Sequence, residues 1–91
     1  MLKDKLVACV NILPQIKSKY WWKEQIETET ESLMIIKTTK SNSKAVIDKV
    51  KENHEYEVPE IIFTEVIEGY LPYVSWVKEN CVNKEKPKEE I

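Results

Sequence analysis

The first part of the chain has the hydrophobic pattern of β-strands. Residues 7–13 form an apolar, β-rich run that Pro14 closes, and because proline has no N–H to donate we expect it at a sheet edge or a bulge. Tyr20–Trp22 also favour a strand. Residues 25–31 alternate charged and polar positions, which is typical of an exposed hairpin arm, with a turn expected near Glu29.

Two further strands are predicted later in the chain. Residues 33–36 are continuously apolar, which suits a strand covered on both faces. Residues 57–67 are the longest strand candidate, and Gly69 breaks it. Pro59 near its start fits an edge position.

Apolar residues at helical spacing predict two of the three helices. Leu2 and Leu6 are spaced i, i+4, as on the buried stripe of a helix that ends near Lys5. A second helix of about three turns follows residues 41–43, whose side-chain oxygens suit its N-cap. The apolar face of this second helix holds Val46, Val50 and His54.

The last part of the chain predicts a third helix and then a charged segment. Pro72 suits the first turn of a helix. The buried stripe expected on this helix consists of Tyr73, Trp76, Val77 and Cys81. Residues 83–91 are highly charged and carry Pro87, so we expect a disordered tail there and a single domain over residues 1–82.

Composition narrows the class of partner. Fourteen basic and 16 acidic residues give a net charge of −2, which argues against a nucleic-acid partner, because phosphate binding requires a basic face. No apolar run approaches the ~20 residues of a membrane span, and no signal peptide is visible. Cys9 and Cys81 have no metal or redox spacing, so we expect two free thiols and a cytoplasmic protein. A chain of 91 residues has a small core, which oligomerisation would help to complete.

The run His54–Glu60 is richer in polar groups than the start of a strand requires. It reads His-Glu-Tyr-Glu-Val-Pro-Glu, and it resembles the His-Pro-Tyr-Glu-Val-Pro-Glu run of the CutA divalent-cation-tolerance proteins, departing from it at Glu55 alone. Four more blocks resemble that family in the same order, although the family usually has glycine where Glu24 sits. These blocks are Ala8–Ile12, Tyr20–Lys23, Ile35–Thr38 and Tyr73–Val77.

The resemblance implies an α+β, ferredoxin-like fold. Its plan is a βαββαβ-type antiparallel sheet with helices on one face, plus a C-terminal helix, and family members pack as compact homotrimers. Met1 lies only a few residues before the Ala8–Ile12 block, so we expect the family's first strand and most of its first helix to be absent here. That strand lies in the middle of the sheet, and each buried backbone group left unpaired by its loss costs roughly 1–3 kcal/mol.

The resemblance also implies a divalent-cation site, with copper as the expected metal and no organic cofactor. His54 is the only histidine, and imidazole and the Cys9 thiolate both suit copper, while Glu57 offers an oxygen ligand. Two alternatives remain open. Cys9 can be a small hydrophobe in a buried strand, and His54 can cap the end of a helix.

A second set of residues resembles positions near the family's inter-subunit cleft. This set consists of Trp22, Lys37, Tyr56 and Glu60. A lysine beside an aromatic ring and a carboxylate can hold an anionic small ligand, or it can be an ordinary ion pair at a subunit boundary. The aromatic residues expected at the trimer interface are Trp21, Tyr73 and Trp76.

Catalytic motifs are missing from the sequence. No serine or cysteine lies in a nucleophile motif, and a single glycine excludes the usual phosphate-binding loops. His54 and Glu57 can form an acid–base pair, but nothing indicates a substrate. We therefore predict a non-catalytic, copper-binding homotrimer of the CutA type. The alternative is a signalling or scaffold trimer, similar to the PII proteins, that binds a small effector between subunits.

Overall fold

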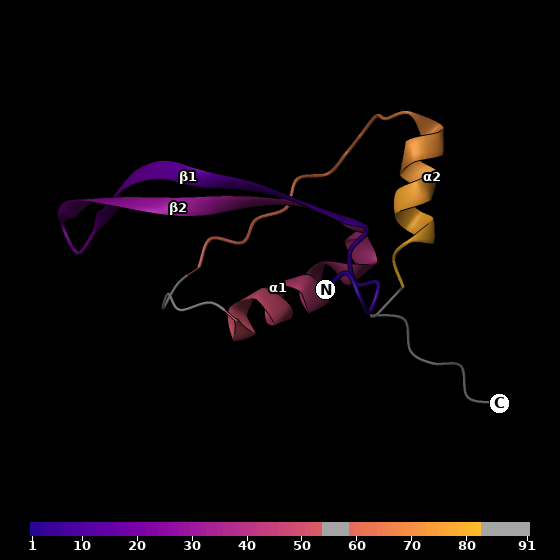
Figure 1. The fold of residues 1–91 in the computed structure, drawn as a ribbon, viewed down its shortest axis with the longest axis horizontal. Helices are drawn as coiled ribbons and strands as arrows, with labels where there is room; N and C mark the ends of the chain where they lie inside the picture. Colours follow the sequence, from indigo (N-terminus) through magenta and orange to yellow (C-terminus); the bar gives the residue numbers. More distant parts are fainter. Residues whose placement is uncertain (54–58, 83–91) are drawn as a thin grey trace.

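A computed structural model describes residues 1–53 and 59–82, and it shows a long β-hairpin that projects from a smaller helical end (Figure 1). The two strands form a two-stranded antiparallel sheet. The elements in chain order are β1 (Cys9–Trp22), β2 (Gln25–Lys37), the short 3-10 helix η1 (Lys40–Asn42), α1 (Ser43–Glu52) and α2 (Leu71–Glu79). The three predicted apolar or aromatic β-segments before residue 37 are therefore parts of two long strands.

A β-bulge lets β1 continue through its proline. The pairing register shifts between Leu13 and Ile16, so that Pro14 and Gln15 lie opposite Ser32 alone. Gln15 has a φ of 58°, the left-handed conformation found in some bulges. Of the two positions expected for Pro14, a sheet edge or a bulge, the structure shows the bulge, where the missing N–H falls at an interruption of the ladder.

The hairpin turns at Lys23 and Glu24, which are the two residues between β1 and β2. Their φ angles are 49° and 67°, and two consecutive left-handed residues are characteristic of a two-residue type I′ turn. The turn predicted near Glu29 is wrong, because Glu29 lies inside β2 and pairs with Ser18. The alternating residues belong to β2, where Thr28 and Thr30 are exposed and the intervening glutamates are half-buried.

The N-terminal residues close like the end of a helix. The Lys5 N–H donates to the Leu2 carbonyl (3.1 Å) and the Leu6 N–H donates to the Met1 carbonyl (3.0 Å), while Lys5 has a φ of 57°. These bonds and this left-handed residue make a Schellman motif, which ends α-helices. The helical turn predicted to end near Lys5 is present in this form.

The core lies between the N-terminal residues and α1. Leu6, Val7 and Val46 are at most 3% exposed, and they are the buried hydrophobic residues in the described part of the chain. The partly buried residues packed against them are Met1, Val10, Ile36, Ala45 and Val50. The predicted apolar face of α1 is confirmed at Val46 and Val50, and His54 lies outside the described residues.

Asn42 is fully buried and connects three segments. It occupies the N-cap position of α1, but its side chain makes no capping hydrogen bond there, contrary to the predicted role. Its amide nitrogen instead donates to the carbonyls of Leu6 (3.0 Å) and Val82 (2.6 Å). The Val82 N–H donates in turn to the Lys5 carbonyl at 2.7 Å. The end of the described chain is thereby fastened to its beginning.

The strand predicted over residues 57–67 is absent from the described residues. Residues 59–67 form no ladder with β1 or β2, and Ile67 is 94% exposed. An extended segment becomes a strand only when a neighbour pairs with its backbone. In the described structure the sheet consists of β1 and β2, and no third strand lies between this sheet and the segment.

Two predicted buried surfaces are exposed. Leu33 and Ile35 on β2 are 47% and 46% exposed, although that strand was expected to be covered on both faces. On α2, Tyr73 and Trp76 are 45% and 43% exposed, and the helix buries none of its described side chains. Both predictions fail for the same reason, since the described chain has too few elements to cover the sheet and the last helix together.

Candidate functional site

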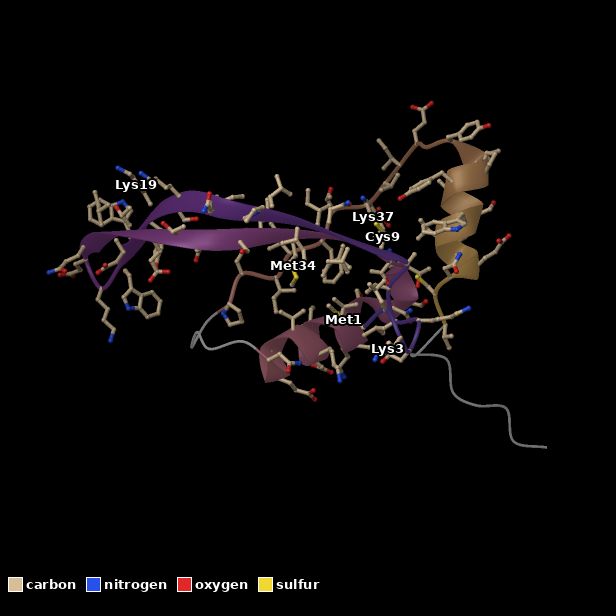
Figure 2. The ribbon with its side chains drawn as sticks, viewed as in Figure 1. Met1, Lys3, Cys9, Lys19, Met34 and Lys37 are labelled. Carbon is tan, nitrogen blue, oxygen red and sulfur yellow. The ribbon has the colours of Figure 1, made fainter. Side chains whose placement is uncertain are left out.

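The base of the hairpin brings together Cys9, Asn11 and Lys37. Figure 2 shows Cys9 and Lys37 next to each other at this end of the hairpin. Cys9 and Lys37 are direct cross-strand partners, so their side chains share a face, and Asn11 lies two residues along β1 on that same face. Lys37 Nζ lies 4.0 Å from Cys9 Sγ and donates a hydrogen bond to Asn11 Oδ1. A predicted metal ligand and a predicted cleft residue therefore form one cluster.

Cys9 is half-buried, and its sulfur has polar neighbours. Asn11 Oδ1 lies 3.8 Å from Cys9 Sγ, on the same side of the sulfur as the Lys37 ammonium to which it is hydrogen-bonded. The thiol is thus accessible and does not belong to the core cluster around Val46. The lysine ammonium beside it opposes a bare cation, so a metal bound at Cys9 needs anionic or imidazole ligands from elsewhere.

Asn11 is the member of this cluster that sequence reasoning did not identify. Its signal was its i, i+2 spacing from Cys9 within a β-rich run, which places both side chains on one face of a strand. A cross-strand partner such as Lys37 follows only from the register, and the register depends on the bulge and the turn.

The other predicted metal ligands, His54 and Glu57, lie outside the described residues, as does the predicted cleft residue Tyr56. Among residues 1–53 and 59–82, no group of three or more His, Cys, Asp or Glu side chains gathers as a metal site would require. Glu60 is described, and it is exposed at the start of the extended segment.

Trp22 lies at the opposite end of the hairpin from Lys37. It pairs with Gln25 next to the turn, whereas Lys37 pairs with Cys9 at the base. β1 has 14 residues, so at about 3.3 Å per residue its ends are roughly 40 Å apart. One chain therefore does not bring Trp22 to Lys37, and a cleft that contains both needs residues from two chains.

The aromatic residues predicted at an interface are exposed in the single chain. Trp21 near the hairpin turn is 71% exposed, and Tyr73 and Trp76 on α2 are 45% and 43% exposed. The rings of Tyr73 and Trp76 stack with centroids 5.7 Å apart and an interplanar angle of 26°. Large exposed aromatic surface of this kind is characteristic of protein contacts.

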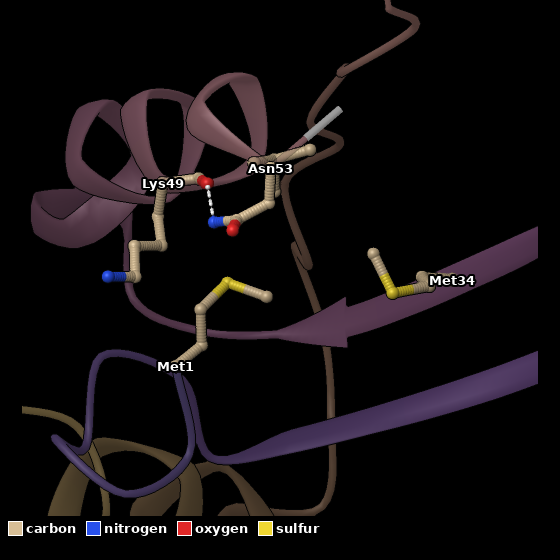
Figure 3. Close-up of a pocket in the computed structure, with 5 residues that line it drawn as sticks. Met1, Met34, Lys49 and Asn53 are labelled. Atoms are coloured by element: carbon tan, nitrogen blue, oxygen red, sulfur yellow. Dashed lines mark hydrogen bonds between the residues drawn. The ribbon is translucent and has the colours of Figure 1, made fainter. Parts of the chain in front are cut away.

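A separate open hollow of about 270 Å³ lies between α1 and the base of the sheet (Figure 3). Its lining is mostly apolar, with the Lys49 side chain as its charged group, and the Asn53 amide donates to the Lys49 carbonyl at 2.9 Å. The lining residues are Met1, Met34, Lys49, Val50 and Asn53. They come from segments far apart in sequence, so no local sequence motif predicts this hollow.

Comparison with known proteins identifies the family. The sequence model of the family described as CutA1 divalent ion tolerance protein matches residues 1–80.

No helix in the described part of the chain is long and apolar enough to cross a membrane.

Relatives of known structure share the fold. The chain is 47% identical over 78 residues to the chloroplastic protein CutA 1 of rice, covering 86% of this chain and 44% of that protein, so it spans less than half of that relative's length. The crystal structure of CutA1 from rice matches with a TM-score of 0.87 at 44% identity, covering 91% of this chain and 76% of that one. The PII-like protein CutA from Nostoc matches with a TM-score of 0.84 at 28% identity, covering 90% and 80%. These matches confirm the α+β, ferredoxin-like class, and the chain belongs to the CutA1 divalent ion tolerance family.

Proposed function

We propose that this protein is a non-catalytic homotrimer of the cytoplasm that binds a divalent cation, with copper as the metal. The observation that carries the metal assignment is the accessible thiol of Cys9 in a polar cluster, in a chain of a divalent ion tolerance family. Both cysteines are free, as a reducing compartment would keep them.

The proposed ligands are Cys9, His54 and Glu57. Thiolate and imidazole are preferred by copper over the harder divalent cations, and a carboxylate adds negative charge. This charge matters because the Lys37 ammonium, 4.0 Å from Cys9 Sγ, must be balanced before a cation can bind nearby. Ligands from neighbouring subunits would complete the coordination.

Trimer formation is supported by two features of the single chain. Trp22 and Lys37 resemble residues of one cleft, yet they lie at opposite ends of the hairpin, so a cleft holding both requires a second copy. The exposed aromatic residues on α2 and near the turn provide apolar surface for such contacts.

A copper titration of the wild type and three variants tests the metal site. We expect His54→Ala and Cys9→Ser each to weaken copper binding at least tenfold, because each removes a ligand. Cys81→Ser is the matched control, since Cys81 is also a free, half-buried thiol but contacts Thr38 and not Lys37. If all four proteins bind copper equally, the assignment is wrong.

A PII-like role is the second candidate, and the Lys37–Asn11 hydrogen bond favours it, because a positioned ammonium can hold an anionic effector. Pyrophosphate is the probe, and we expect its binding to raise the melting temperature of the wild type. Lys37→Ala should keep the ligand-free melting temperature and lose this shift. A lower melting temperature of the ligand-free variant would instead assign Lys37 a structural role.

A further inference from the structure

In the outer half of the hairpin, residues 16–31, basic and acidic side chains lie on opposite faces of the two strands. Directly opposite residues of an antiparallel pair share a face, and successive residues alternate between faces. Lys17 pairs with Thr30 and Lys19 pairs with Thr28, so one face carries two lysines flanked by threonines. Figure 2 shows Lys19 projecting from the part of the hairpin that lies far from the helices. We call this surface the basic face.

The opposite surface of the same hairpin is acidic. Ile16 pairs with Glu31, Ser18 with Glu29 and Tyr20 with Glu27, which places three glutamates in one row along β2. We call this surface the acidic face. Its glutamates are half-buried by their neighbours, and Ser18 Oγ donates to Glu31 Oε2 at 2.7 Å. The cross-strand neighbours are thus uncharged on both faces.

The lysines of the basic face are not neutralised within the chain. Lys17 and Lys19 have no ion-pair partner among residues 1–53 and 59–82, and both side chains are exposed. The ion pairs found there join Lys40 to Glu65 and Lys49 to Glu52, at the helical end of the molecule.

The two faces have matching repeats. Alternate residues on a strand lie about 7 Å apart, so the lysine row and the glutamate row have the same spacing. Two rows of opposite charge with equal spacing can face each other over several residues without loss of register. An ion pair repeated in this way becomes a network, which stabilises more than an isolated surface pair.

We propose that the basic face of one hairpin packs on the acidic face of the hairpin of a second copy of this chain. This interface rests on the proposed trimer and specifies which surfaces meet. Because each copy has both faces, such contacts are head-to-tail and close into a ring when the rotation allows it. Trp21 and Ile26 share the basic face and are 71% and 62% exposed, so they add apolar area to the contact.

Charge exchange between the faces tests this interface. The basic face is reversed by Lys17→Glu with Lys19→Glu, and the acidic face is reversed by Glu27→Lys with Glu29→Lys. Each double variant has like charges on both faces, so we expect its trimer to dissociate at a protein concentration at least tenfold higher than that of the wild type. The fourfold variant exchanges the charges at these four positions, with Glu31 unchanged, and should form a tighter trimer than either double variant. Light scattering across a dilution series measures the mass.

A control variant outside the hairpin shows whether a loss of assembly comes from the paired faces or from the change in net charge. Lys44→Glu with Lys51→Glu changes the net charge by the same amount as the basic-face variant, at exposed positions of α1, and should leave assembly unchanged. Far-ultraviolet circular dichroism checks that every variant keeps its fold. Trimers of unchanged affinity in both double variants would overturn the interface and leave the trimer standing. A monomeric wild type would overturn the trimer itself, and a fourfold variant as weak as either double variant would also reject the face pairing.

Discussion

The helical end and the hairpin of this molecule are stabilised by different means. At the helical end, Leu6, Val7 and Val46 exclude water, and the buried Asn42 side chain holds two backbone carbonyls. The outer hairpin has backbone ladder bonds but few buried side chains, and Trp21 beside its turn is 71% exposed.

The helical end is stabilised by contacts within one chain, whereas the hairpin leaves apolar and charged surface that a second chain can cover. At the helical end the buried polar groups have hydrogen-bond partners and the core is small. Replacing one of its few buried residues should therefore lower the free energy of unfolding. The hairpin has a strained turn, separated charges and exposed aromatic rings, so single substitutions there should act mainly on local strain or on assembly. Three tests, at Asn42, at Glu24 and at the Lys40–Glu65 pair, sharpen this contrast.

The largest expected effect follows removal of the buried amide. Asn42→Ala removes the amide that donates to the carbonyls of Leu6 and Val82. The Leu6 carbonyl keeps the Thr38 hydroxyl as a donor at 2.8 Å, so the Val82 carbonyl loses its side-chain donor, and such a loss costs about 1–3 kcal/mol. We expect the free energy of unfolding to fall by about 2 kcal/mol. Urea unfolding at a fixed protein concentration measures it.

Asn53→Ala is the matched control for that substitution. Asn53 also donates its amide to a backbone carbonyl, that of Lys49 at 2.9 Å, but its side chain is exposed and water can replace it. We expect a change of under about 1 kcal/mol. Equal losses for Asn42→Ala and Asn53→Ala would mean that burial at the helical end does not set its stability.

A smaller effect of opposite sign is expected at the hairpin turn. Glu24 has a φ of 67°, and a left-handed conformation costs a non-glycine residue about 1–2 kcal/mol. Glu24→Gly relieves this strain, although glycine also gains freedom in the unfolded chain, so we expect a net stabilisation of about 1 kcal/mol. Thermal and urea unfolding both report it.

Glu24→Ala shows whether strain or charge is responsible. Alanine removes the carboxylate but keeps the Cβ, so the strain at positive φ remains and stability should not rise. A gain as large as that of Glu24→Gly would assign the effect to the charge of Glu24 among the neighbouring glutamates of the hairpin.

Local patterns predicted the parts of the fold that depend on local chemistry. Pro14 indicated the bulge because it lacks an N–H, and the spacing of Val46 and Val50 indicated the buried face of α1. Leu2 and Leu6 at helical spacing indicated the turn that ends at Lys5. In each case one or two residues fix the backbone without help from distant segments.

Predictions that depended on distant partners were less successful. The turn was misplaced because Lys23 and Glu24 carry no turn signature, and only cross-strand register determines that they adopt left-handed conformations. The strand expected before Gly69 failed because pairing needs a neighbour that the described chain does not supply. The cluster of Cys9 with Lys37 likewise depends on the register.

The smallest effect is expected where the extended segment touches the helical end. Lys40 Nζ lies 3.2 Å from Glu65 Oε1, and the two side chains are 86% and 70% exposed. An exposed pair gains little because water screens it, so Lys40→Ala and Glu65→Ala should each change the free energy of unfolding by less than about 0.5 kcal/mol. A double-mutant cycle isolates the coupling between the two charges. A coupling above about 1 kcal/mol would show that this ion pair holds residues 59–67 against the helical end. The molecule would then have a third region, fixed by charge, beside the helical end that is stable alone and the hairpin that depends on a partner.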